Sequence, residues 1–211
     1  MDKNYEHIET LIKRYPALAV CKQDIVDAYV ILEESYRKGN KLLVAGNGGS
    51  AADALHIVGE LMKAFVLPRK LNKQICDALD KNSQNAEYLK KNLQMALPAI
   101  SLVGEVGLTT AYSNDVAPDL MFAQQVLGYA KPGDVFLGIS TSGNSKNIIY
   151  AAEVAKARGM RVIGLTGENG GKMKGVSDVC IKVPEKETFK VQELHLPVYH
   201  AICLEVEKSI F

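Results

Sequence analysis

Short apolar runs alternate with longer segments of helical periodicity along most of this chain. The near-continuous hydrophobicity of these runs is typical of strands that are covered on both faces of a parallel sheet. The runs are Leu42–Ala45, Ala99–Val103, Val135–Ile139, Val162–Leu165 and Val179–Val183. The segments between them carry apolar residues at helical spacing. The pattern predicts an α/β fold, a doubly wound five-stranded parallel sheet.

Two segments stand outside this alternation. Residues 4–38 carry helical periodicity that Pro16 interrupts, which predicts that the N-terminal segment 1–38 forms two helices joined near that proline. Residues 66–97 hold about two helices' worth of polar-rich sequence, Asn72–Leu79 and Ala86–Met95, where one short connection would suffice. We interpret residues 66–97 as a helical insertion that forms a cap. Its charged side chains, Arg69 among them, are expected to form a solvated face.

Size and charge narrow the class of partner. A chain of 211 residues fits one domain of generous size, and we expect residues 1–211 to form it. The formal net charge of +1 provides no field that would attract nucleic acid or a membrane surface. No basic-then-apolar leader or membrane span is visible, so a cytoplasmic location is expected. Four widely spaced cysteines are expected to be reduced core residues, and these are Cys21, Cys76, Cys180 and Cys203.

Two loops of small residues follow predicted strands and lead into predicted helices. The first contains Asn47, Gly48, Gly49 and Ser50, and the second spans Ser140–Ser145 and carries four hydroxyls. Because the first amides of a helix lack partners within it, such loops bring amides and hydroxyls close to an anion. The second loop is the more specific, since a helix cap needs one hydroxyl and not four. We therefore predict that a phosphate or sugar phosphate binds there.

Candidate acid–base residues come from two helices. His56 and Glu60 lie one turn apart on the predicted helix Ala51–Phe65, where the alternative is a surface ion pair. A carboxylate and an imidazole can transfer protons or bind a metal. His195 and His200 lie in the segment before a predicted helix Ala201–Ile210, with Pro197 in its first turn or as a kink in a longer helix. Histidines in such a segment are usually core or cap residues, and His7 has no supporting neighbours.

Further polar residues follow the second predicted strand. Asn114 and Asp115 are expected in a loop at the carboxyl edge of the sheet, where they would hold sugar hydroxyls or form a turn.

Together these motifs resemble the SIS (sugar isomerase) domain family and, within it, the phosphoheptose isomerases. The resemblance runs through most of the chain and rests on Ala45–Ser50, His56–Glu60, Ser140–Ser145 and Val191–His200. It implies a flavodoxin-like SIS domain that converts sedoheptulose 7-phosphate to D-glycero-D-manno-heptose 7-phosphate through an enediol, for surface polysaccharide synthesis.

The resemblance also implies roles for individual residues. Glu60 would be the base and His200 its acid partner. The phosphate would be held by Ser140, Thr141, Ser142 and Ser145, with Asn47 and Ser50 on the sugar chain. In members with zinc, the ligands fall on His56, Glu60, Gln192 and His200. Zinc would polarise the carbonyl, whereas a metal-free site would use protonated His200. Family members form tetramers with active sites between subunits.

Two departures from the family pattern bear on specificity. Ala64 stands where family isomerases commonly have an arginine, and residues 66–97 are longer than the compact enzymes need. We hypothesise that this insertion contacts a neighbour's site. The alternatives are a non-catalytic SIS tetramer that binds a protein such as a replication initiator, a sugar-phosphate sensor, and an isomerase of another ketose phosphate. The complete set of acid–base residues favours an enzyme, and no DNA-binding helix pair accompanies the domain.

Overall fold

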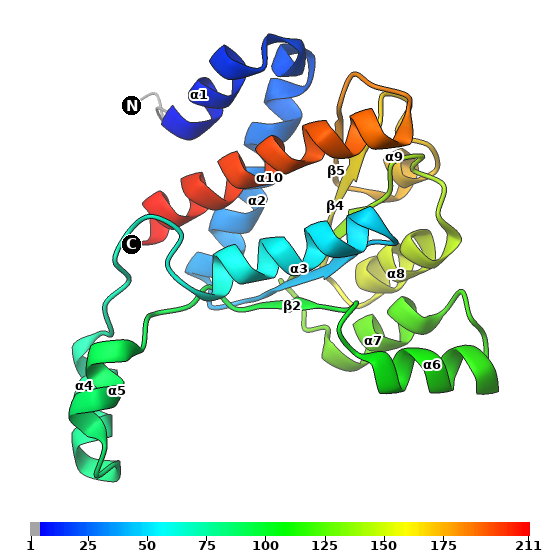
Figure 1. Cartoon of the computed structure of the whole chain (residues 1–211). Coiled ribbons are helices and arrows are strands. Elements are labelled where there is room, and N and C mark those ends of the chain that lie inside the picture. The colour runs from blue at the N-terminus through cyan, green and yellow to red at the C-terminus, as the bar shows by residue number, and fades with distance from the viewer. Residues whose placement is uncertain (1–4) are drawn as a thin grey trace.

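A computed structural model describes residues 5–211, and its centre is a parallel sheet with the strand order β2-β1-β3-β4-β5 (Figure 1). All five predicted strands are present, with bounds that differ by at most two residues from the prediction. They are β1 (Leu42–Ala45), β2 (Ala99–Ser101), β3 (Val135–Ile139), β4 (Arg161–Thr166) and β5 (Val179–Lys182). The predicted doubly wound α/β fold is confirmed.

The strand order reverses beside β1. The chain leaves β1 for the edge strand β2 and then returns to β3 on the other side of β1, so that Leu42 pairs with both Ala99 and Val135. Connections that diverge on opposite sides of a sheet leave a crevice at the carboxyl ends of the strands. In this protein the crevice lies between the ends of β1 and β3, which are the strands that carry the two predicted phosphate loops.

Alternate residues of the strands pack into two separate hydrophobic layers. Leu42 and Val44 of β1 face one layer, and Leu43 and Ala45 face the other. The first layer is covered by α1 (Glu6–Arg14), α2 (Lys22–Arg37), α3 (Gly49–Met62) and α10 (Thr188–Ile210). The second is covered mainly by α7 (Met121–Tyr129), α8 (Lys146–Ala157) and α9 (Met173–Val176). Strands covered on both faces explain the uniformly apolar runs in the sequence.

The N-terminal helices form as predicted, with one addition. Pro16 does not simply separate α1 from α2 but begins a short 3-10 helix, η1 (Pro16–Cys21). A proline at the first position of a helix loses no hydrogen bond, because that amide has no partner within the helix.

The C-terminal segment forms one helix, so the prediction of a separate helix that begins at Ala201 is wrong. The structure agrees better with the alternative, in which Pro197 lies inside a longer helix. α10 runs from Thr188 to Ile210 with Pro197 inside it. A proline inside a helix removes one backbone hydrogen bond and costs about 3 kcal/mol. Because α10 packs against α1, α2 and α3, its buried contacts offset that cost. As a result, Gln192 and His200 lie on one continuous helix.

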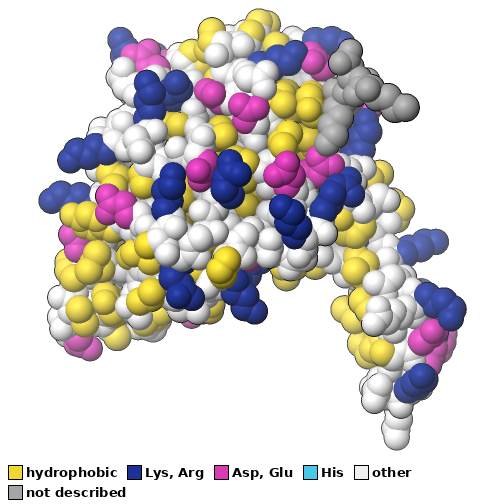
Figure 2. Space-filling view, turned by 180° about the vertical axis from the view of Figure 1, so that it is seen from behind, with side chains coloured by type: hydrophobic (Ala, Val, Ile, Leu, Met, Phe, Trp, Pro, Cys, Tyr) yellow, Lys and Arg dark blue, Asp and Glu magenta, His cyan; other side chains and the backbone are white. Residues whose placement is uncertain are grey.

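The helical insertion forms an arm. α4 (Lys73–Asn82) and α5 (Ala86–Asn92) pack against each other and project away from the sheet, as Figures 1 and 2 both show. The arm therefore does not cap this chain's own sheet. Cys76 lies on it half-buried, whereas Cys21, Cys180 and Cys203 are buried as predicted, and all four are free thiols.

The segment after β2 is also helical. α6 (Val106–Asp115) contains Asn114 and Asp115, which we predicted in a loop. Hydrophobic side chains gather at the lower left of Figure 2, on the side of the molecule that holds α6 and α7. Val106, Val116 and Leu127, from α6, α7 and the segment between them, are exposed.

Within residues 5–211, no helix combines the length and the hydrophobicity that crossing a membrane requires.

Candidate functional site

The two predicted phosphate loops meet in a pocket of about 330 Å³ at the crevice between β1 and β3. Asn47 to Ser50 line it from the loop that opens α3, and Ser140, Thr141 and Ser145 line it from the loop that opens α8. α10 closes the third side with Thr188 and Gln192. The amino ends of three helices thus converge on one small polar pocket, which favours an anion.

Hydroxyl groups are held in place within the β3 loop. The Ser140 and Ser145 hydroxyl oxygens lie 3.0 Å apart, and Ser140 is almost fully buried. Gly143 adopts φ +66°, and a Cβ there would lie 2.1 Å from the carbonyl oxygen of Gly170. Only glycine fits that approach. Ser142 is exposed outside the pocket, and its hydroxyl accepts a hydrogen bond from the Asn144 N–H.

The β1 loop is fixed from two sides. The side-chain amides of Asn47 and Asn147 donate to each other's oxygen at 3.0 and 2.9 Å, which ties this loop to α8. Gly49 lies against the side chain of Gln192, where a Cβ would come within 2.5 Å of the amide nitrogen. The pocket shape therefore depends on the absence of a side chain at Gly49.

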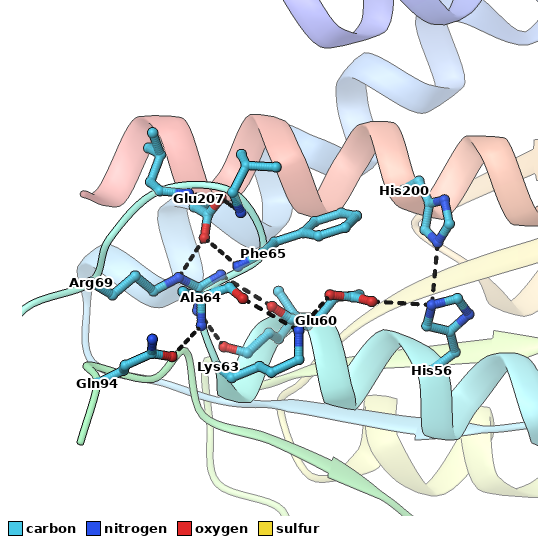
Figure 3. Close-up of polar contacts among 12 residues, drawn as sticks. His56, Glu60, Lys63, Ala64, Phe65, Arg69, Gln94, His200 and Glu207 are labelled. Atoms are coloured by element: carbon cyan, nitrogen blue, oxygen red, sulfur yellow. Dashed lines mark hydrogen bonds and ion pairs between the residues drawn. The ribbon is translucent and has the colours of Figure 1, made fainter. Parts of the chain in front are cut away.

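Farther along α3, the predicted acid–base residues come together (Figure 3). His56 Nε2 lies 3.1 Å from Glu60 Oε1 and 3.4 Å from His200 Nε2. His56 and Glu60 are one turn apart on α3, whereas His200 reaches them from α10, which runs beside α3. The predicted i, i+4 pair is therefore completed by a third residue from 140 positions away in the sequence.

A tyrosine and an aspartate orient His56 from behind. The Tyr199 hydroxyl donates to Asp53 Oδ1 at 3.2 Å and lies 3.0 Å from His56 Nδ1. A hydroxyl that donates to Asp53 accepts from His56, so Tyr199 holds Nδ1, and Nε2 is the ring nitrogen that faces Glu60 and His200.

Burial governs the charge of His200. Desolvation and the neighbouring His56 lower the pKa of His200, and Glu60 opposes this only in part. The imidazole of His200 is therefore neutral at neutral pH. The ring of Phe65 also packs edge-on against it, with centroids 5.5 Å apart.

Glu60 has a cation beside it despite the absent arginine. Lys63 Nζ lies 3.3 Å from Glu60 Oε2, while Ala64, at the position of that arginine, uses its N–H to donate to Gln94. Arg69, which we expected on a solvated face, is instead fully buried and donates to the carbonyl oxygens of Glu60 and Leu61.

The spacing of the donor atoms is consistent with a metal ion. Two ligands bound to one tetrahedral zinc at 2.0–2.1 Å are about 3.3 Å apart, close to the two distances from His56 Nε2. Within residues 5–211, however, no group of three or more His, Cys, Asp or Glu side chains is arranged to hold a metal as it stands. His56, Glu60 and His200 contact each other in series, and the fourth predicted ligand, Gln192, lines the phosphate pocket.

Other predicted residues lie elsewhere. Asn114 and Asp115 are hydrogen-bonded to each other on α6 and do not line the phosphate pocket. His195 is fully buried in the core, which is one of the two positions expected for histidines of this segment. The His7 N–H donates to Glu205.

Comparisons with known proteins agree with this arrangement. Residues 89–167 match the family model described as SIS domain. The chain is 43% identical to the phosphoheptose isomerase of Aneurinibacillus thermoaerophilus over 178 residues. This match covers 84% of this chain and 77% of the relative.

The chain belongs to the phosphoheptose isomerase family. Among solved structures, the phosphoheptose isomerase of Neisseria gonorrhoeae has a TM-score of 0.75 at 32% identity, over 96% of this chain and 95% of that chain. The phosphoheptose isomerase of Francisella tularensis has a TM-score of 0.74 at 28% identity, over 95% of this chain and 94% of that chain. The resemblance drawn from the motifs is confirmed.

Several residues of this phosphoheptose isomerase site were not found from the sequence. Asp53 and Tyr199 each precede a predicted ligand closely, but no local pattern links the two. Glu207, which accepts a hydrogen bond from Arg69 Nε at 2.7 Å, left a weak signal, since it is an acidic residue seven positions after His200 on a helix rich in apolar residues.

Proposed function

We propose that this member of the phosphoheptose isomerase family interconverts sedoheptulose 7-phosphate and D-glycero-D-manno-heptose 7-phosphate. The observation that carries the proposal is the cluster of His56, Glu60 and His200 beside a phosphate-type pocket on the same pair of helices. Ser50 and Glu60 are ten residues apart on α3, about 15 Å along the helix axis. That separation suits a substrate with a phosphate at one end of a carbon chain and a carbonyl near the other.

The phosphate would bind in the pocket at the ends of β1 and β3. The Thr141 hydroxyl would donate to its oxygens together with whichever of the Ser140 and Ser145 hydroxyls is the acceptor in their shared hydrogen bond, and the first amides of α8 would add unpaired donors. Asn47, Gly48, Gly49 and Ser50 would contact the adjacent sugar hydroxyls together with Gln192.

Proton transfer would use Glu60 and His200. Isomerisation needs a base that removes a proton from C1 and returns it to C2, and Glu60 is the carboxylate in place. The hydroxyl proton must also move between O1 and O2. Because the lowered pKa keeps His200 neutral, its imidazole can donate to one oxygen and accept from the other without carrying a net charge.

A zinc ion would be held by His56, Glu60 and His200, with Gln192 as the expected fourth ligand, and it would supply a Lewis acid for the carbonyl oxygen. The orientation of His56, whose Nδ1 is held by Tyr199 and whose Nε2 faces Glu60 and His200, supports this assignment. A rearrangement of the three side chains, which contact each other in series, would have to accompany zinc binding.

We also propose a homotetrameric assembly in a cytoplasmic setting, with residues 1–211 as one SIS domain. The four free cysteines are consistent with a reducing compartment. The projecting arm of α4 and α5 is available to a neighbouring subunit, which supports contact with a neighbour's site.

The decisive experiment is to incubate the purified protein with sedoheptulose 7-phosphate and follow the aldose by NMR, with chelator or with added zinc. Glu60→Gln should lower turnover by about 10²–10⁴-fold. Glu153→Gln, at an exposed glutamate of α8, is the control and should retain full turnover. No turnover by the unmodified protein under any condition would favour the alternative of a non-catalytic SIS tetramer that binds a protein. Turnover of another ketose phosphate alone would change the assigned substrate.

A further inference from the structure

A buried ion pair joins the loop that follows α3 to α10, beyond the acid–base cluster (Figure 3). Arg69 Nε donates to Glu207 Oε1 at 2.7 Å, and both side chains are fully inaccessible to solvent. Removing two charges from water costs several kcal/mol per ion unless hydrogen bonds satisfy them fully. The stability of this pair therefore depends on the hydrogen-bond partners of the Glu207 carboxylate and of the Arg69 guanidinium.

Glu207 is satisfied by the loop that follows α3. Its carboxylate accepts from the backbone N–H groups of Phe65, Val66 and Leu67 at 2.8, 2.9 and 3.1 Å, in addition to Arg69. Burial alone would raise the pKa of Glu207, but these donors lower it below the usual value, so the carboxylate stays charged. Glu207 therefore gathers the loop around itself.

Arg69 turns back toward α3. Its guanidinium donates to the carbonyl oxygens of Leu61 and Glu60, the second at 3.1 Å. These carbonyls belong to the last turn of α3, where the helix itself provides no partner. Arg69 thus caps the helix at the residue whose side chain is the proposed base.

The same contacts reach the proposed acid partner. Glu207 follows His200 by seven residues, two helical turns, and so lies on the same face of α10. The Phe65 N–H is bound by Glu207 while the Phe65 ring packs against His200. One ion pair therefore contacts the backbone of Glu60 on one side and, on the other, the backbone of Phe65, whose ring packs on His200.

We propose that Arg69 and Glu207 are positioning residues that hold Glu60 and His200 at the separation the reaction needs. This inference rests on the proposed isomerase function. Neither residue contacts the reacting groups itself. Their effect passes through the carbonyl of Glu60 and the ring of Phe65, and a shift of about 1 Å between reacting groups can cost 10²-fold in rate.

Glu207→Gln tests the proposal, because it keeps the shape of the side chain and removes the charge that binds the three amides. We expect kcat for sedoheptulose 7-phosphate to fall 10–100-fold while KM changes less than threefold, since the phosphate pocket is untouched. Glu205→Gln is the matched control. Glu205 is a buried acid on the same helix that accepts the His7 N–H on the side facing α1, and its kcat should stay within twofold.

A second readout does not depend on activity. With four histidines in the chain, the ring signals of ¹⁵N-histidine-labelled protein can be assigned, and the contact of the His200 ring with the Phe65 ring can be followed by nuclear Overhauser effects. Because Glu207 binds the Phe65 N–H, loss of the ion pair should weaken this ring contact in Glu207→Gln but not in Glu205→Gln.

The outcomes separate the two ideas. An inactive unmodified protein refutes the proposed function, and the contact between the Phe65 and His200 rings still tests the positioning role. Unchanged kcat and an unchanged ring contact in a folded Glu207→Gln protein refute the positioning role. If Glu207→Gln does not fold, Arg69→Lys carries the test, because it keeps the charge but cannot reach both carbonyls. Failure of both variants to fold would overturn the proposal in favour of a purely structural ion pair.

Discussion

The hydroxyl of Tyr199 lies 3.0 Å from Nδ1 of His56 and joins that imidazole to Asp53. The contact fixes which nitrogen of His56 faces the acid–base cluster. Outer partners of this kind typically contribute 10–100-fold to metal affinity or activity.

Tyr199→Phe should therefore lower both zinc affinity and kcat by about 10–100-fold with little loss of stability. The ring remains, so its packing against His56 and His200 is kept. Calorimetric zinc titration and steady-state kinetics measure the effect. Tyr129→Phe, at an exposed tyrosine at the end of α7, is the control. Equal zinc affinity in the Tyr199 and Tyr129 variants would refute the orienting role.

Ser145→Ala should raise KM for the phosphorylated substrate about 10–100-fold, because a hydrogen bond to a charged group contributes about 1.5–3 kcal/mol. The change should weaken competitive inhibition by inorganic phosphate to a similar degree. Ser177→Ala removes a hydroxyl that donates to Met173 in α9 and serves as the control. A phosphate inhibition constant unaffected by Ser145→Ala would place the phosphate elsewhere.

Gly143→Ala should unfold the loop around the phosphate pocket. The new Cβ would lie 2.1 Å from the Gly170 carbonyl oxygen at a φ of +66°. We expect a lower melting temperature and at least a tenfold rise in KM. Gly128→Ala in α7 is the contrasting variant, since nothing lies within 4 Å of its Cβ and helical alanine is favoured by about 0.5–1 kcal/mol. Equal melting temperatures for the two variants would contradict this account.

Acid should destabilise the protein through His195. Burial lowers its pKa from 6.5 to about 4, opposed only in part by the Thr166 backbone, and no side-chain hydrogen bond of ordinary geometry reaches either ring nitrogen. Between pH 6.5 and 4 the unfolded chain binds a proton that the folded chain does not, so the free energy of unfolding falls as the pH falls. The contribution of this residue is about 3 kcal/mol, complete above pH 6.5 and lost toward pH 4.

Urea unfolding at pH 7.5 and pH 4.5 measures this loss. His195→Leu should lose less of its unfolding free energy than the unmodified protein between the two pH values, whatever its stability at pH 7.5. An identical loss in both proteins would rule out His195 as the source.

Replacing residues 72–92 with a short glycine linker should leave the sheet domain folded, because α4 and α5 pack on each other and not on the sheet. If the arm reaches a neighbouring subunit, the shortened protein should dissociate at higher concentration or show a changed KM. Analytical ultracentrifugation over a dilution series and steady-state kinetics measure the two effects. Unchanged assembly together with unchanged KM would refute the role of the arm.

Local patterns determined much of the architecture. Each strand is a run of apolar residues, and a run without polar residues predicts a strand that is buried on both faces. Each phosphate loop is a cluster of small and hydroxyl residues at a strand end. The i, i+4 spacing of His56 and Glu60 required only a helix. These features depend on residues that are close in the sequence, so periodicity and turn chemistry predict them.

Other predictions failed where one pattern permits several packings. α10 continues through Pro197 because contacts with three other helices offset the lost hydrogen bond, and α6 forms where polar residues suggested a loop. The spacing of apolar and polar residues in the sequence does not show how far packing contacts offset a lost hydrogen bond.

By itself, the sequence determined the α/β fold, the two phosphate loops and the identity of the proposed acid–base residues. Only the tertiary structure decided that His200 meets His56, that Tyr199 orients it, and that Arg69 is buried on Glu207 and not exposed with its charged neighbours. The physical reason is that burying a charge or orienting an imidazole depends on partners about 140 residues away, which approach only when α3 and α10 pack side by side.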